Sequence, residues 1–180
     1  MILLARHGET DDNIEPIRIQ GSVDTPLNDT GRAQARELAE RVAGEGLQAL
    51  YCSQLSRARE TAEIVGARIG LEPVVDPRLA EGYRGSIEGR LWEDVAREDP
   101  ELYAAWRAAG PKFRFPEGES LLEQQERTVA ALVDITQAGR LPALAVCHGG
   151  TIRVALCHTH RRGLETFHDW DVPNVALVRL

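Results

Sequence analysis

Residues 1–10 read Met-Ile-Leu-Leu-Ala-Arg-His-Gly-Glu-Thr, a short apolar run that ends directly in an arginine, a histidine and a glycine. An apolar run of this length is typical of a buried strand. In open α/β sheets, ligands bind at the carboxyl ends of the strands, which is where Arg6 and His7 stand. The opening of the chain therefore predicts both a strand of a central sheet and one edge of a binding site.

The rest of the chain continues with short apolar runs separated by helical patterns. Buried strands are expected at residues 2–5, 49–52, 73–76, 144–147 and 174–180. Apolar residues recur at helical spacing over 35–42 and 58–69, and residues 149–156 follow a strand directly and read as a helix. Ser120 and Glu123 form a capping-box pattern before a further helix. Strands that alternate with helices predict a three-layer α/β/α sandwich around a mainly parallel sheet.

Residues 82–119 break this alternation. They are rich in glycine, proline, charged and aromatic residues, with short helices expected near 92–96 and 101–108. We interpret them as a short inserted segment over the site. The length of 180 residues suits one domain, which we take to be 1–180.

Composition narrows the function classes. The chain is 43% hydrophobic and 27% charged, which is ordinary globular usage. Its net charge of −7 argues against nucleic acid or an anionic membrane as a partner. No apolar run approaches the ~18 residues of a membrane span, and no secretory signal is expected. Three cysteines do not suggest a disulfide framework, so we expect buried reduced thiols in a cytoplasmic protein.

Chemically active residues stand at four successive strand ends. Arg6 and His7 follow the first strand, Arg57 the second, Glu81 the third and His148 the fourth. Taken singly, each residue is more often structural than catalytic. Together they supply what phosphate chemistry requires: guanidinium groups for the oxygens, free N–H groups at a helix start, and a nucleophile.

Several motifs in the same order resemble the histidine phosphatase superfamily, with its phosphoglycerate-mutase-like fold. These motifs cover nearly the whole chain: Ala5–Thr10 with Asn13, then Arg18, Gln20-Gly21, Asp24 and Pro26-Leu27, then residues 30–35, 53–58 and 60–62, Leu79-Ala80-Glu81, residues 87–89, residues 116–120, and Cys147–Gly150 with Ile152-Arg153. A single Arg-His-Gly triplet is weak evidence, whereas five motifs in order are specific.

The resemblance implies a two-step phosphoryl transfer by a metal-independent phosphatase of the histidine acid type, with no cofactor. His7 is then the nucleophile that becomes phosphohistidine, and Glu81 is the proton donor to the leaving oxygen. Arg6, Arg57 and His148 hold the phosphoryl oxygens. The expected phosphate- and substrate-binding residues are Asn13, Arg18, Gln20, Gly21, Ser22, Tyr83, Arg84 and Gly149.

The charges in this set agree with that mechanism. Arg6, Arg57 and a protonated His148 are expected to depress the pKa of His7, so that its imidazole is neutral and able to attack. Phosphoryl transfer depends mostly on positioning and charge stabilisation, which a cationic cluster supplies. A carboxyl held near an anion has its pKa raised, which suits Glu81 to give a proton and later to take one from water.

Three alternatives remain at this point. A phosphoglycerate mutase is the first, although Glu81 is followed by Gly-Tyr-Arg and the cations Arg107, Lys112 and Arg114 are separated, which departs from the mutase pattern. A non-catalytic binding module of the same fold is the second. A metal site is the third, but the expected metal content is none, because His158 and His160 do not share a helical face.

The substrate is expected to be a small phosphorylated metabolite rather than a phosphoprotein. Specificity must come from residues around the leaving group: Arg18, Gln20, Ser22, Tyr83, Arg84, Arg107, Lys112 and Arg114. Several cations there favour a leaving group with its own acidic group. The resemblance also leaves a homodimer open.

Overall fold

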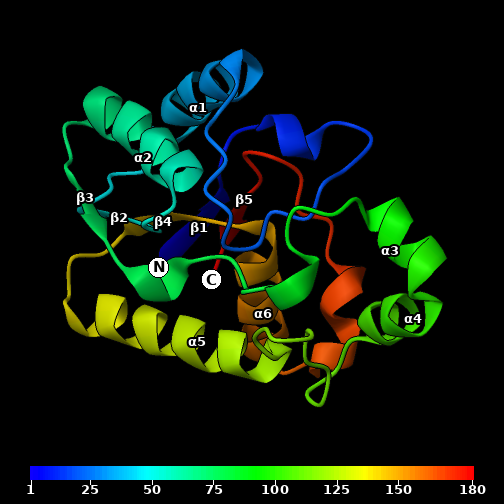
Figure 1. The fold of residues 1–180 in the computed structure, drawn as a ribbon. Helices are drawn as coiled ribbons and strands as arrows, with labels where there is room; N and C mark the ends of the chain where they lie inside the picture. The colour runs from blue at the N-terminus through cyan, green and yellow to red at the C-terminus, as the bar shows by residue number, and fades with distance from the viewer.

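The computed structural model describes all residues from 1 to 180. Its centre is a five-stranded sheet in the order β3-β2-β4-β1-β5 (Figure 1). Three strands run parallel as its core: β1 (Ile2–Arg6), β4 (Ala143–Cys147) and β2 (Ala49–Cys52). The edge strands are β3 (Pro73–Val75), which is parallel to β2, and β5 (Leu177–Arg179), which is antiparallel to β1.

Two helices cover each face of the sheet. The helices α1 (Asp29–Val42) and α2 (Ser56–Ile69) lie on one face, and α5 (Leu121–Gln137) and α6 (Gly149–Thr159) lie on the other (Figure 1). Alternation along β1 explains the two layers, because Leu3 belongs to the same apolar cluster as α1 and α2, whereas Leu4 belongs to that of α5 and α6. The predicted three-layer sandwich is confirmed.

The two edge strands differ from the sequence prediction. Residues 73–76 were expected as a buried strand, but Val74 and Val75 are 52% and 45% exposed. The reason is that β3 has only one neighbour in the sheet, so little covers it. The last strand is also shorter than the expected 174–180, because residues before Leu177 form a turn.

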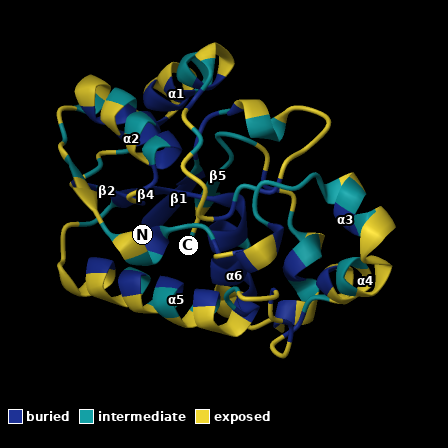
Figure 2. Ribbon diagram, viewed as in Figure 1, coloured by how far each residue is buried: buried dark blue, intermediate teal, exposed yellow.

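Residues 82–119 contain two short helices, α3 (Trp92–Glu98) and α4 (Pro100–Ala108), as the sequence predicted. A 3₁₀ turn, η3 (Gly85–Ile87), precedes them. The segment builds a third apolar cluster around Trp106, Phe113 and Phe115, which are buried, and this cluster includes Phe167 of the 3₁₀ helix η4 (Leu164–Asp169). Figure 2 shows the resulting contrast between the buried strands and the exposed outer faces of α3 and α4.

No helix in the structure combines the length and the apolar character that a membrane span requires. Cys52, Cys147 and Cys157 are buried and unpaired, in agreement with the expectation of reduced thiols.

Candidate active site

Four of the predicted strand-end residues, Arg6, His7, Arg57 and Glu81, line one cavity of about 470 Å³. His148 is not part of the lining and lies behind it, against the ring of His7. Arg6 is the last residue of β1 and His7 follows it, whereas Arg57 lies in the first turn of α2. His148 follows β4 directly and is the N-cap of α6. Parallel strands bring these positions to the same edge of the sheet, which places residues from distant parts of the chain around one point.

His7 is held in one tautomer. Its side chain is 3% exposed, and Nδ1 lies 2.6 Å from the carbonyl oxygen of Gly8. A carbonyl can only accept, so Nδ1 carries the proton and Nε2 keeps a free lone pair. Burial and the charges of Arg57 and Arg6 hold the pKa of His7 well below 6.5. This direction agrees with the expected neutral imidazole, and attack by His7 remains a prediction.

The two arginines are fixed by backbone carbonyls and keep other N–H groups for a ligand. Arg6 donates from Nη1 to Val172 O at 2.8 Å. Arg57 donates from Nη1 to Val23 O at 2.7 Å and from Nη2 to Gly21 O at 2.8 Å. The Nε atoms of both side chains are buried without a hydrogen-bond partner. Buried donors are normally satisfied, so these two favour an anionic ligand at this point.

His148 completes this cluster, but not in the charge state expected. Its ring is fully buried, lies 5.1 Å from the ring of His7, and has no hydrogen-bond partner at either nitrogen. Burial, followed by the charges of Arg57, His7 and Arg6, holds its pKa well below 6.5. The expectation of a protonated His148 is wrong for this structure, because two nearby guanidinium groups already supply positive charge.

Glu81 reaches the same cavity from the segment after the 3₁₀ turn η2 (Pro77–Leu79). Its Oε2 accepts from the N–H of Gly150 at 2.9 Å. Its Oε1 accepts from Gly82 N at 2.8 Å, Gln124 Nε2 at 2.9 Å and Arg84 Nη2 at 3.2 Å. A Cβ on Gly150 would lie 2.2 Å from Oε1, so this close approach requires glycine.

These contacts oppose the expected pKa of Glu81. Burial raises the pKa, but the charge of Arg84 and the hydrogen bonds from Gly150, Gly82 and Gln124 outweigh it and lower the pKa to about 2. The protein's own groups therefore keep Glu81 ionised, contrary to the expectation of a raised value. Negative charge brought by a substrate raises the pKa of Glu81 further, in the same direction as burial.

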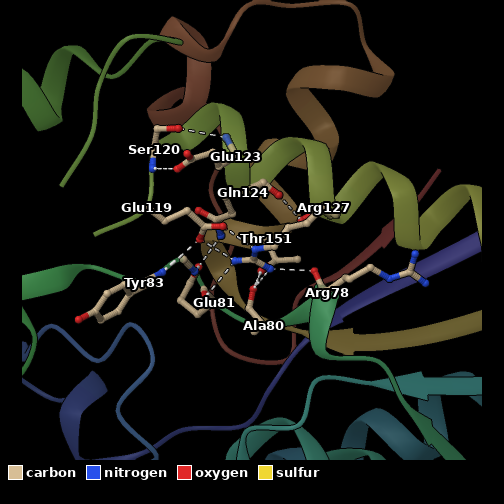
Figure 3. Close-up of polar contacts among 12 residues, drawn as sticks. Arg78, Ala80, Glu81, Tyr83, Glu119, Ser120, Glu123, Gln124, Arg127 and Thr151 are labelled. Carbon is tan, nitrogen blue, oxygen red and sulfur yellow. Dashed lines mark hydrogen bonds and ion pairs between the residues drawn. The ribbon is translucent and has the colours of Figure 1, made fainter. Parts of the chain in front are cut away.

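Arg127 of α5 holds the main chain around Glu81 (Figure 3). Its Nη1 donates to the carbonyls of Arg78 and Ala80, both at 2.8 Å, and its Nη2 donates to Glu81 O at 3.2 Å. The same guanidinium forms a two-point ion pair with Glu119, at 2.6 and 2.9 Å. The backbone that carries Glu81 is thus tied to α5.

The comparisons with known proteins agree with this geometry. The family model of the histidine phosphatase superfamily (branch 1) matches residues 2–180. This chain belongs to that superfamily.

Relatives within the superfamily carry names of two activities. The chain is 38% identical over 156 residues to the phosphoglycerate mutase-like protein 4 of Arabidopsis thaliana, covering 84% of this chain and 67% of the relative. It is 35% identical over 156 residues to the metal-independent phosphoserine phosphatase of the same plant, covering 84% and 65%. A mycobacterial glucosyl-3-phosphoglycerate phosphatase, solved with VO3, is 27% identical with a TM-score of 0.90, covering 98% of this chain and 88% of that one.

Most of the substrate-binding residues expected from the superfamily motifs line the cavity: Asn13, Arg18, Gln20, Gly21, Arg84 and Gly149. Gln20 Oε1 is buried without a partner, and Arg107 also lines the cavity. Ser22, Tyr83, Lys112 and Arg114 are not part of the lining.

Two of the residues outside the lining, Ser22 and Arg114, have other side-chain partners, and Tyr83 is exposed. Ser22 donates through both N and Oγ to Glu88, and Tyr83 is 46% exposed. Arg114 pairs with Glu123 at 2.5 Å. The structure therefore gives no support for substrate contacts by Ser22, Tyr83, Lys112 or Arg114.

Sequence reasoning missed Gln124, Arg127, Thr151 and Arg153 as parts of the site. One signal was present: α5 buries Gln124 and Thr128 in line with Leu121, Ala131 and Ile135, so polar residues interrupt its apolar face. Arg153 is a charged residue in α6, whose neighbouring positions are almost all buried.

Proposed function

We propose that this protein hydrolyses phosphomonoesters of a small metabolite through a phosphohistidine at His7. The observation that carries the proposal is the environment of His7 Nε2. Its lone pair is free, and unpartnered buried nitrogens of Arg6, Arg57 and His148 belong to the same cluster. Such a cluster binds three phosphoryl oxygens and leaves the phosphorus open to attack.

In the first step His7 Nε2 forms a bond to phosphorus while the bond to the leaving oxygen breaks. Glu81 gives a proton to that oxygen, which leaves as an alcohol. In the second step water attacks the phosphorus, Glu81 takes the proton, and the N–P bond breaks to release inorganic phosphate. Glu81 suits both steps because a bound phosphoryl dianion raises its pKa from the low value that Arg84 and its hydrogen-bond donors impose.

This assignment makes the protein a metal-independent phosphatase of the histidine acid type. Positive charge at the phosphoryl group comes from Arg6 and Arg57, whose guanidinium groups remain cationic at neutral pH. Three unpaired buried thiols are compatible with a reducing compartment, and we propose the cytoplasm.

The test is substitution of the nucleophile. We expect His7→Ala to abolish release of phosphate and to abolish acid-labile labelling of the protein by a phosphorylated substrate. His160→Ala is the matched control, because His160 is exposed and outside the cavity. Turnover by His7→Ala at nearly the wild-type rate would refute the proposal.

A mutase activity is the second candidate, since several relatives bear mutase names. A mutase returns the phosphoryl group from His7 to a second hydroxyl of the substrate, whereas a phosphatase passes it to water. Incubation with 3-phosphoglycerate distinguishes the two, because a phosphatase yields glycerate and phosphate and a mutase yields 2-phosphoglycerate. We expect glycerate and phosphate.

A further inference from the structure

Arg84 is a buried arginine beside the proposed proton donor. It is 6% exposed, and it lies directly before the 3₁₀ turn η3. Its backbone N–H donates to Glu88 Oε1 at 2.8 Å, and its Nη2 donates to Glu81 Oε1 at 3.2 Å. Burying a guanidinium costs free energy unless an opposite charge accompanies it. Here the accompanying charge is the carboxylate of Glu81.

The inserted segment holds the guanidinium of Arg84 in place. Its central carbon lies 5.2 Å from the centre of the Trp106 ring and 4.7 Å from the centre of the Phe115 ring. Both rings are buried, and contacts between a guanidinium and an aromatic face are attractive. The start of α6 is also close, because a Cβ built on Gly150 would lie 2.7 Å from Arg84 Nη2. A movement of the guanidinium away from Glu81 would break these contacts.

The two carboxylate oxygens of Glu81 differ in their hydrogen bonds. Oε2 accepts only from Gly150 N, whereas Oε1 accepts from Gly82 N, Gln124 Nε2 and Arg84 Nη2. A carboxylate oxygen has about two lone-pair sites, so Oε1 has none left for a proton and Oε2 has one. Oε2 is therefore the oxygen that gives a proton and takes one. Arg84 binds the other oxygen, so its hydrogen bond can persist through both steps of the reaction.

Charged and titratable groups act on Glu81 from every element around it. They are Arg6 and His7 at the end of β1, Arg57 of α2, Arg84, Arg127 of α5, Cys147 of β4 and Arg153 of α6. Burial lowers the pKa of His7 and raises the pKa of the Cys147 thiol, so both are uncharged. Among the arginines, Arg84 alone forms an ion pair with the carboxylate of Glu81, and the two side chains are 7% and 14% exposed. Arg84 is therefore the group that most strongly opposes protonation of Glu81.

The second step of the proposed reaction needs this positive charge. After the alcohol leaves, the phosphoryl group stays on His7, in the cavity that Glu81 also lines. Burial and the negative charge of that group both favour a protonated carboxyl. A protonated Glu81 cannot take the proton of the attacking water, so the phosphohistidine would persist. A fixed positive charge at Oε1 opposes this protonation and leaves Oε2 free to accept.

We propose that Arg84 is a positioning residue for hydrolysis of the phosphohistidine, which holds Glu81 as a carboxylate with Oε2 free to take the proton of water. Trp106 and Phe115 of the inserted segment hold Arg84 in that position. When water attacks, its oxygen forms a bond to phosphorus and its proton passes to Oε2. The N–P bond breaks, and its electron pair returns to His7 Nε2. This inference rests on the proposed phosphatase function.

The test measures the two steps separately in Arg84→Met. Methionine packs well against aromatic rings and carries no charge. In a single turnover of glycerol 3-phosphate, the rise of acid-labile phosphoprotein reports the first step and its decay reports the second. We expect the rise to be at least as fast as in wild-type protein, because Glu81 is more readily protonated, and the decay to be at least about tenfold slower at acidic pH. The acidic limb of the pH profile of the decay should move up by about 1–3 pH units, which is the usual effect of an adjacent opposite charge on a carboxyl pKa.

Two further variants make the result independent of the folding of Arg84→Met. Arg84→Lys keeps a positive charge and should move the acidic limb less than Arg84→Met does. In Arg84→Ala, added methylguanidinium should accelerate the decay, because it supplies the missing charge in the space that the side chain leaves.

Arg162→Met is the matched control. Arg162 also pairs with a carboxylate, that of Asp169 at 2.6 Å, and its guanidinium carbon lies 5.4 Å from the centre of the Trp170 ring. It is exposed and does not line the cavity. Its substitution should change neither the rise nor the decay of the phosphoprotein.

The outcomes separate this role from its alternatives. An equal slowing of rise and decay, with no shift of the acidic limb, would leave Arg84 a purely structural role and overturn the inference. A higher KM with an unchanged pH profile would assign Arg84 to substrate binding and overturn it as well. Either result leaves the phosphatase function standing. Wild-type protein that forms no phosphoprotein and releases no phosphate would overturn the proposed function and this inference with it.

Discussion

Arg127→Met removes the contacts that tie the segment carrying Glu81 to α5. In the wild-type protein this one guanidinium donates to five acceptors: three main-chain carbonyls of residues 78–81 and both carboxylate oxygens of Glu119 (Figure 3). Methionine keeps the apolar stem but donates no hydrogen bond. We expect the variant to lose both stability and the alignment of the proton donor.

The size of each effect follows from these contacts. Breaking one side of a largely buried, hydrogen-bonded ion pair costs about 3 kcal/mol or more. For a chain of this length, that lowers Tm by roughly 6–12 °C. A displacement of the acid by about 1 Å costs on the order of 10²-fold in rate. The carboxyl of Glu81 keeps its own hydrogen-bond donors in the variant, such as Gly150 N–H. We therefore expect the carboxyl to shift slightly and not to leave the site.

The assay measures kcat at 20 °C, well below Tm, on glycerol 3-phosphate and on p-nitrophenyl phosphate. Nitrophenolate leaves without a proton, so only the alkyl phosphate depends on the placement of Glu81. We expect a loss of about 10²-fold on glycerol 3-phosphate and a much smaller loss on p-nitrophenyl phosphate. Arg114→Met is the matched control and should change neither rate. Equal losses on the two substrates would refute a positioning role for Arg127 and leave only a structural one.

Three further predictions concern the same site. Glu81→Gln should lose roughly 10²–10⁴-fold on alkyl phosphates and far less on p-nitrophenyl phosphate, and a uniform loss would assign proton donation to another group. Activity should survive chelation by EDTA, because Arg6 and Arg57 supply the positive charge; a loss reversed by magnesium or zinc would contradict this. The pKa values of His7 and His148 are lowered by folding, so the unfolded chain takes up their protons first as the pH falls. The free energy of unfolding, measured in urea, should therefore decrease below about pH 6.5, by up to about 1.4 kcal/mol per pH unit for each histidine. Glu81 adds a further loss between about pH 4.5 and pH 2, because its pKa in the folded protein is about 2. A flat profile between pH 7 and pH 5 would show that the histidines are not held neutral by the fold.

The pattern of apolar residues along the chain was sufficient to predict the layers of the sandwich. It was also sufficient to predict which residues gather around the proposed phosphoryl position. Apolar runs of strand length and helical spacing depend on near neighbours in the chain, so β1, β4 and α5 could be placed from sequence. Arg6, His7, Arg57 and His148 each follow or flank such a run, and parallel strands necessarily bring their carboxyl ends together.

The charge states and the outer wall of the cavity depended on contacts between residues far apart in the chain. The pKa of Glu81 is lowered by the charge of Arg84, three residues away, and by hydrogen bonds from Gly150 and Gln124, 69 and 43 residues away. Arg107 of α4 and Arg153 of α6 come to line one cavity only in the folded chain, and Arg114 pairs with Glu123 outside that cavity. The pKa of a side chain depends on all the groups that surround it in space, and so does its availability to a substrate. The periodicity of a sequence describes only residues that are near one another in the chain.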